Sequence, residues 1–179
     1  MRITLIALVV ALALSACTGD SGGAEGVSSP AAPSTTESAD SGATSTTAAL
    51  TVPPQLADHD IDLVPVGDRL LLLAIVDSPG LREQGLMHVE DLGDLDGMLF
   101  TWSREASGTF WMKNTVIPLD IVWFDESGRF VGRASMVPCE TETCPKYRPP
   151  GNPEFRFAIE ANPGDLDWID ESTVIAYDG

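Results

Sequence analysis

The chain is poor in basic residues and in histidine. Its 179 residues include 10 lysines and arginines against 27 aspartates and glutamates, with 2 histidines, so the formal net charge is −17. A protein this acidic repels nucleic acid, and we therefore expect no nucleic-acid partner. The sequence also lacks a Gly-x-Ser-x-Gly elbow, a His-Glu-x-x-His helix and a phosphate-binding glycine loop. This leaves no familiar enzyme signature, and no cofactor is expected.

Aromatic residues and long hydrophobic runs are missing from much of the chain. The 6 Phe, 4 Trp and 2 Tyr residues all lie after position 99, and no apolar run is long enough to span a bilayer. Of the 37 residues from 18 to 54, 30 are Ser, Thr, Ala, Gly or Pro. Such a segment buries too little apolar surface to offset its ordering entropy, so we expect a disordered tether.

The hydrophobic run that does occur lies at the N-terminus. Met1-Arg2 precedes an apolar run over residues 3–14, and Leu14-Ser15-Ala16-Cys17 closes it, which is the pattern of a secretory signal. The closing residues resemble a bacterial lipobox, which implies that Cys17 is lipidated and anchors the protein to the extracytoplasmic face of a cell membrane. An ordinary signal peptide with a chance cysteine is the alternative. The expected organisation is a signal peptide over 1–16, a lipidated tether over 17–55 and a globular domain over 56–179.

Short apolar runs within the domain predict a series of strands. The runs 61–66 and 69–76 flank Gly67-Asp68, which predicts a hairpin, and Ser78-Pro79 predicts the start of a short helix that reaches Val89. Further strands are expected over 98–102, 109–114, 119–124, 130–137, 154–161 and 173–177, with one helical turn over 163–169. Many short strands with one or two short helices predict a mainly-β or α+β single domain, a small barrel or sandwich.

Several motifs within this domain resemble those of one protein family. The most specific are Phe110-Trp111-Met112-Lys113-Asn114-Thr115 and Ile117-Pro118-Leu119-Asp120. They are accompanied by Leu81–Met87, Gly97–Phe100, Pro138-Cys139, Cys144-Pro145-x-Tyr147 and Glu160. Over residues 63–177 the chain therefore resembles the DUF192 family, also called UPF0127. The resemblance implies a compact β-rich domain that is often exported or lipid-anchored and whose biochemical role is unknown.

Lys113 is the centre of the candidate ligand site. It lies beside Trp111 and Asn114, and if partly buried it needs a carboxylate partner, for which Asp120 and Glu160 are the candidates. The favoured interpretation is a Lys–carboxylate pair that stabilises the sheet, with the asparagine bonding to turn amides. The other is a site for a small polar or anionic ligand, to which Arg82 contributes unless it is a solvated helix residue. The candidate ligand-binding residues are Arg82, Trp111, Lys113, Asn114, Asp120 and Glu160.

Cys139 and Cys144 are the two cysteines that remain once Cys17 is assigned to lipidation. Two thiols cannot complete a structural zinc site, and His59 and His88 show no ligand spacing, so no metal is expected. A redox pair usually has two intervening residues, whereas this pair has four. In an exported protein a Cys139–Cys144 disulfide is therefore the favoured interpretation.

These observations leave three hypotheses for function. The favoured one is a lipid-anchored extracytoplasmic module that binds a small ligand or serves as an envelope accessory protein. The second is a carboxylate-dependent hydrolase or carbohydrate-active enzyme, in which Asp120 and Glu160 converge to about 5–10 Å. The third is a structural module that binds another protein through a flat apolar patch.

Overall fold

The computed structural model of the protein describes residues 49–178. The expected signal peptide, the lipidation site Cys17 and most of the expected tether lie outside the described residues. Within the described part, no helix has the length and apolar character needed to cross a membrane. The elements, in chain order, are η1 (Pro54–Leu56), β1 (Ile61–Val66), β2 (Arg69–Val76), α1 (Pro79–Gln84), β3 (Gly97–Ala106), β4 (Leu119–Phe124), β5 (Phe130–Met136) and β6 (Phe155–Ala161).

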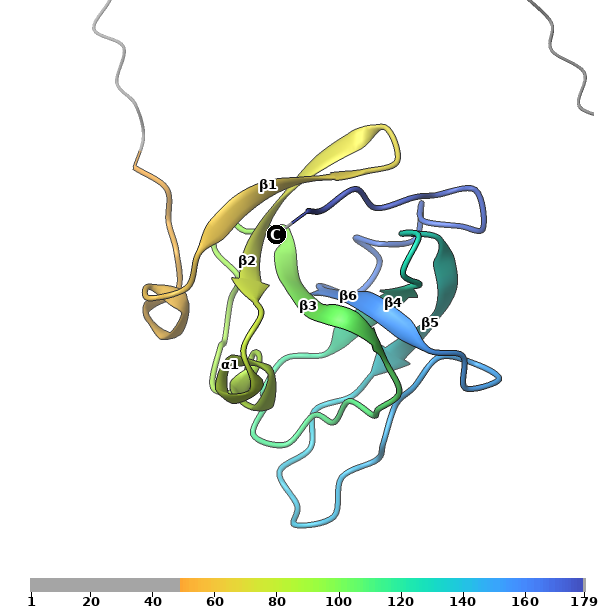
Figure 1. The fold of residues 1–179 in the computed structure, drawn as a ribbon. Coiled ribbons are helices and arrows are strands. Elements are labelled where there is room, and N and C mark those ends of the chain that lie inside the picture. The colour runs from red at the N-terminus through yellow and green to blue at the C-terminus, as the bar shows by residue number, and fades with distance from the viewer. Residues whose placement is uncertain (1–48, 179) are drawn as a thin grey trace, which may run out of the picture. The chain divides into compact units, whose positions relative to one another are not determined.

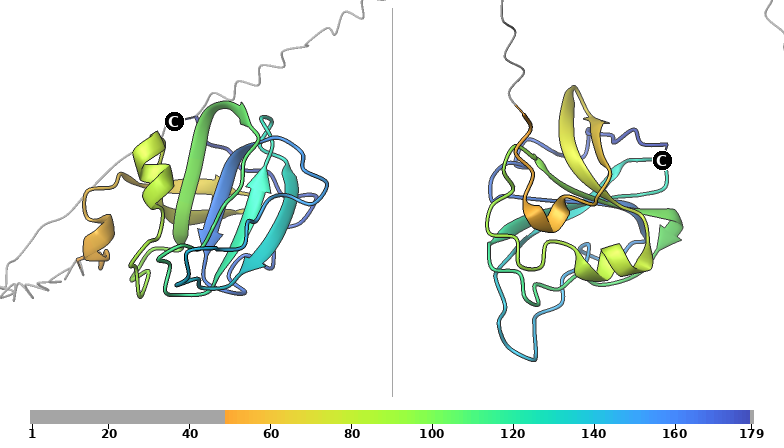
Figure 2. Two further views of the ribbon diagram at one scale, coloured as in Figure 1. Left: turned by 90° about the horizontal axis from the view of Figure 1, so that it is seen from below. Right: turned by 90° about the vertical axis from the view of Figure 1, so that its left-hand side faces the viewer.

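The strands form one mixed sheet of six, in the order β1-β2-β3-β6-β4-β5 (Figure 1). Every neighbouring pair is antiparallel except β2 and β3, which run parallel. A parallel pair needs a crossover connection, and here α1 lies in that crossover. In Figure 2 (left) β3, β6, β4 and β5 follow one another side by side, with α1 beside β3. The last strand of the chain, β6, is therefore central in the sheet.

The fold confirms a small, mainly-β single domain, and its architecture is a single six-stranded sheet. The sheet is curled but is not closed into a barrel, because β1 and β5 remain its two edges. The C-terminal segment, expected as a strand over 173–177, instead makes isolated bridges from Ile175 to Val66 and from Val174 to Arg129. It thus joins the β1–β2 hairpin to the β4–β5 hairpin without completing a ladder (Figure 1).

Side chains on both faces of the sheet are buried, in two hydrophobic clusters. One cluster packs Ala158 of β6 with Met98, Phe100 and the residues that follow α1. The other packs Phe157 and Ile159 with the C-terminal part of the chain. β6 is therefore buried on both faces. Simple alternation along the strand would place its first residue, Phe155, on the side of Phe157, but Phe155 joins the Ala158 cluster because β3 shifts register opposite it.

Besides the C-terminal segment, three further predicted elements differ from the structure. The helix starts as expected, with the Ser78 hydroxyl accepting from the Leu81 amide at 3.4 Å, but it ends at Gln84 because Gly85 takes a positive φ of 49°. Residues 109–114 do not form a strand and make only isolated bridges to Cys139 and Tyr147. Residues 163–169 form successive turns rather than a helical segment.

Candidate functional site

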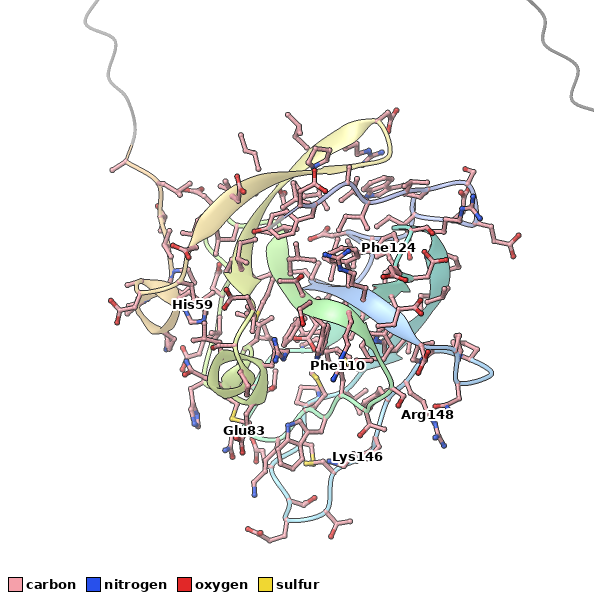
Figure 3. The ribbon with its side chains drawn as sticks, in the orientation of Figure 1. His59, Glu83, Phe110, Phe124, Lys146 and Arg148 are labelled. Atoms are coloured by element: carbon pink, nitrogen blue, oxygen red, sulfur yellow. A yellow bond between two sulfur atoms is a disulfide. The ribbon has the colours of Figure 1, made fainter. Side chains whose placement is uncertain are left out.

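A cleft of about 240 Å³ lies between α1, β3, β6 and the loop after β3. Five aromatic side chains form part of its wall, its charged side chains come from α1 and β6, and the loop after β3 adds three hydroxyl groups. In Figure 3, Phe110 and Glu83 mark two sides of this region. Among the residues that line the cleft are Arg82, Phe100, Trp102, Phe110, Phe155 and Glu160.

Glu160 is the buried acid of this cleft. It lies on the central strand β6, paired with Met98 of β3 on one side and with Ile121 of β4 on the other. The residue is 5% exposed, and this burial raises the pKa of its carboxyl to about 8. Within residues 49–178, no lysine or arginine lies at ion-pair distance from it. At pH 7 the carboxyl therefore keeps its proton and can both donate and accept a hydrogen bond.

Four aromatic rings pack together along the wall of the cleft. The ring centroid of Phe110 lies 5.2 Å from that of Phe100, 6.1 Å from that of Trp102 and 5.9 Å from that of Phe155. Trp102 and Phe155 also meet at 5.2 Å, edge to face. Because edge-to-face pairs are favourable and rigid, the wall is held in place by its own packing.

Arg82 is a structural part of the cleft rather than a solvated helix charge. Its guanidinium donates to the carbonyl oxygens of Asp77 and Thr101, the latter at 2.9 Å. The same group lies 5.1 Å from the ring centroid of Trp102. Arg82 therefore fastens α1 to β3, and its position is fixed by backbone acceptors.

A second, more open cavity of about 550 Å³ adjoins the first and shares Trp111 with it. Lys113 and Asn114 line this second cavity and do not line the cleft. The expected partners of Lys113 were Asp120 and Glu160, and this expectation is wrong. The Lys113 Nζ instead lies 4.0 Å from Glu142, whose side chain is 97% exposed. Because residues 109–114 do not form a strand, their side chains do not alternate between the two faces of the sheet.

The chain's two lysines both lie near the ring of Trp111. The Nζ of Lys146, labelled in Figure 3, lies 3.8 Å from the ring centroid, and that of Lys113 lies at 5.8 Å. Sequence reasoning missed Lys146, which follows the disulfide loop and had no pattern linking it to the tryptophan. Both ammonium groups thus lie near a ring that lines both cavities.

The expected disulfide between Cys139 and Cys144 is present, with Cα atoms 5.8 Å apart. The segment that contains the disulfide is hydrogen-bonded to residues 110–114, of which Phe110 and Trp111 line the cleft. The Asn114 amide donates to the Cys139 carbonyl at 3.3 Å, and Phe110 and Tyr147 exchange two backbone hydrogen bonds of 2.8 and 2.9 Å. Asn114 has a positive φ of 56° and its carbonyl accepts from His88. The asparagine thus serves a turn through its backbone, whereas its side-chain amide donates to the Met87 sulfur at 3.9 Å and not to the turn amides that were expected as its partners.

Asp120 faces away from the cleft. In the register of β4 against β6, Asp120 pairs with Ala161 while Ile121 pairs with Glu160, so the two carboxyls lie on opposite faces of the sheet. One Asp120 oxygen accepts from the Gly164 amide at 2.8 Å, and the other lacks a protein partner beside a cavity of about 70 Å³ that Arg133 also lines. The structure therefore does not bring together the carboxylate pair on which the hydrolase hypothesis depends.

The aromatic wall is what sequence reasoning missed. Phe100, Trp102 and Phe155 come from two strands that are distant in sequence, and no motif connects them. The available signal was compositional, namely that every aromatic residue lies after position 99.

Comparison with known proteins assigns the family. The family model DUF192, described as "Uncharacterized ACR", matches residues 64–174. The chain belongs to the DUF192 family. The match runs from β1 to the C-terminal bridges, so the DUF192 domain contains every residue that lines the cleft. No curated protein matches the chain.

Two solved structures resemble this DUF192 domain. One is a protein of unknown function from Novosphingobium aromaticivorans DSM 12444, with 28% identity, a TM-score of 0.58, and coverage of 73% of this chain and 94% of that chain. The other is described as a "putative transcription regulator" from Sinorhizobium meliloti 1021, with 23% identity, a TM-score of 0.56, and coverage of 66% of this chain and 94% of that chain. The second likeness concerns the fold alone.

Proposed function

We propose that this protein is a lipid-anchored, extracytoplasmic binding module whose DUF192 domain holds a small polar ligand in the cleft beside Glu160. One observation carries the proposal: a buried carboxyl that has no ion-pair partner among residues 49–178 borders a cavity with aromatic side chains in its wall. Burying such a group without a partner costs stability, and buried ionisable groups in clefts are characteristic of functional sites. Cavities with mostly apolar walls and a few polar groups are typical of small-molecule sites.

Binding is favoured over hydrolysis by the position of the acids. A glycosidase-type mechanism needs two carboxyls flanking one bond. Glu160 borders the cleft, whereas Asp120 lies on the opposite face of the sheet. The acid pair that the hydrolase hypothesis named therefore does not flank the cleft, and of the two acids that line it Glu160 is buried and Glu83 is exposed.

The membrane anchor rests on the N-terminal sequence. Leu14-Ser15-Ala16-Cys17 ends a signal-like run, and a lipid on Cys17 would hold the domain at the membrane surface. The test is fractionation of cells that express the full-length protein and the Cys17→Ala variant. We expect the wild type in the membrane fraction and the variant outside it. A variant that stays with membranes at high salt would contradict the anchor.

The binding site is tested with a matched pair of tryptophan variants. Trp111 borders the cleft, while Trp168 lies in the other hydrophobic cluster, and each is partly buried with a basic group over its ring. A thermal-shift screen of small polar compounds on the full-length protein should find stabilising compounds. Trp111→Ala should abolish the stabilisation and Trp168→Ala should preserve it. Equal responses of both variants would show that binding occurs elsewhere.

A second candidate function, binding of another protein, is favoured by one feature of the β1–β2 hairpin. Leu63 and Leu70 are 55% and 61% exposed there, beside the open edge of the sheet. This role predicts that a polar substitution at Leu70 impairs function while Trp111→Ala does not. Regulation of transcription, the description of the relative from S. meliloti, is disfavoured because a net charge of −17 opposes binding to DNA.

A further inference from the structure

In the part of the chain that the structure describes, no lysine or arginine forms an ion pair with Glu160, the buried acid of the cleft. Arg82 is the one basic residue among the described residues that line the cleft, and its guanidinium is bound to the carbonyls of Asp77 and Thr101. Lys113 and Lys146 lie near Trp111, outside the set of residues that line the cleft. The position of counter-ion to Glu160 is therefore open to a ligand.

The wall of the cleft suits a positive group. Aromatic faces attract cations through the ring quadrupole. The basic side chains of this protein already take such positions, with Arg82 over Trp102 and Lys146 over Trp111. The rings of Phe100, Phe110 and Phe155 line the cleft and have no basic side chain over them among the described residues.

The overall charge points the same way. At −17 the protein raises the local concentration of cations and lowers that of anions. A site for a small polar or anionic ligand was the alternative interpretation of Lys113, but that lysine lines the neighbouring cavity. An anion would gain no ion pair from the buried carboxyl, because it would oppose the charged form of that group.

We propose that the cleft binds a small organic cation, an alkylammonium or related group, seated against the aromatic wall with Glu160 as its counter-ion. This ligand class rests on the proposed small-ligand function of the same cleft. Affinity would come from ring contacts and from one ion pair formed away from bulk water.

Binding of such a cation must release a proton. Burial raises the pKa of Glu160 to about 8, so the empty cleft holds a protonated acid at pH 7. The ligand pairs with the carboxylate, and the proton leaves to solvent. The other charged groups that line the cleft, Arg82 and Glu83, come from α1, whereas β3 and the loop after it contribute neutral side chains. Affinity should therefore rise about tenfold per pH unit below pH 8 and level off above it.

The test uses three probes of similar size and different charge: tetramethylammonium, tert-butanol and pivalate. Each is titrated into the full-length protein, and binding is followed by the NMR signals of the tryptophan indoles. We expect tetramethylammonium to bind most tightly and pivalate most weakly. The dissociation constant for tetramethylammonium should fall between pH 6 and 8, whereas that for tert-butanol should not change.

Two matched variants separate the ion pair from general charge effects. Glu160→Gln removes the ionisable group and keeps its shape, and it should weaken tetramethylammonium at least tenfold at pH 8, with tert-butanol unchanged. Glu126→Gln makes the same change at an exposed turn and should alter binding less than twofold. Tighter binding of tert-butanol or pivalate to the wild type would overturn the cationic class while leaving a small-ligand cleft intact. Failure of all three probes would also overturn the cationic class, and the tryptophan-variant screen would then decide whether the cleft binds any small ligand.

Discussion

Replacing Glu160 with glutamine should change how the stability of the protein depends on pH. The folded carboxyl has a pKa of about 8 against 4.5 for an ordinary glutamate, because burial disfavours its charged form. Between these values the unfolded chain has lost the proton while the folded protein still holds it. Raising the pH therefore favours unfolding of the wild type, by about 1.4 kcal/mol per pH unit.

The magnitude follows from the same two values. From pH 4.5 to 8 the wild type should lose about 5 kcal/mol of unfolding free energy through this one group. Glutamine does not ionise, so the Glu160→Gln variant is free of this loss. The remaining acidic groups act on both proteins alike and cancel in the comparison. The variant should thus match the wild type near pH 4.5 and exceed it by up to about 5 kcal/mol at pH 8.

The assay is urea unfolding of both full-length proteins at several pH values, followed by tryptophan fluorescence. The quantity to plot is the difference in unfolding free energy, variant minus wild type, against pH. A difference that stays flat between pH 5 and 8 would refute the argument. It would mean that Glu160 ionises as an exposed glutamate does and is not the buried acid of a cleft.

Three further substitutions test other parts of the fold. Cys139→Ser should lower the free energy of unfolding, measured in urea, by about 2 kcal/mol, because the disulfide no longer closes its short loop. In the wild type, a thiol reagent should not label Cys144 unless a reductant is added. Gly85→Ala should destabilise by about 1–3 kcal/mol in urea unfolding, because the position has a positive φ and a new Cβ would lie 3.3 Å from an aromatic ring. Lys113→Met should change stability by less than about 1 kcal/mol, since its partner is exposed. A loss of several kcal/mol on this change would show that Lys113 pairs with a buried acid.

The strands that the sequence predicted well are those whose pattern is local. The hairpin of β1 and β2 follows from two apolar runs around Gly67-Asp68, and its bounds are as predicted. Residues 109–114 were mistaken for a strand because aromatic and β-branched residues there satisfy the same propensity. In the folded protein they pack against β3 and the disulfide segment, and only two isolated bridges form.

The site could be predicted only in part, because it depends on strand order and register. Glu160 and Asp120 belong to strands that turn out to be neighbours, and a difference of one position in register puts their side chains on opposite faces. Nothing in the sequence fixes that register. The disulfide, by contrast, followed from cysteine count and spacing, which are local properties.

The most direct test of the small-ligand cleft is an NMR titration of the full-length protein with ¹⁵N-labelled tryptophan, using a panel of small cationic, neutral and anionic compounds. Trp102 and Trp111 line the cleft, whereas Trp168 lies in the other hydrophobic cluster and serves as an internal reference. The account predicts at least one compound that shifts the indole signals of Trp102 and Trp111 with a common dissociation constant and leaves Trp168 unmoved. A panel that shifts none of these signals, or shifts Trp168 alone, would contradict it.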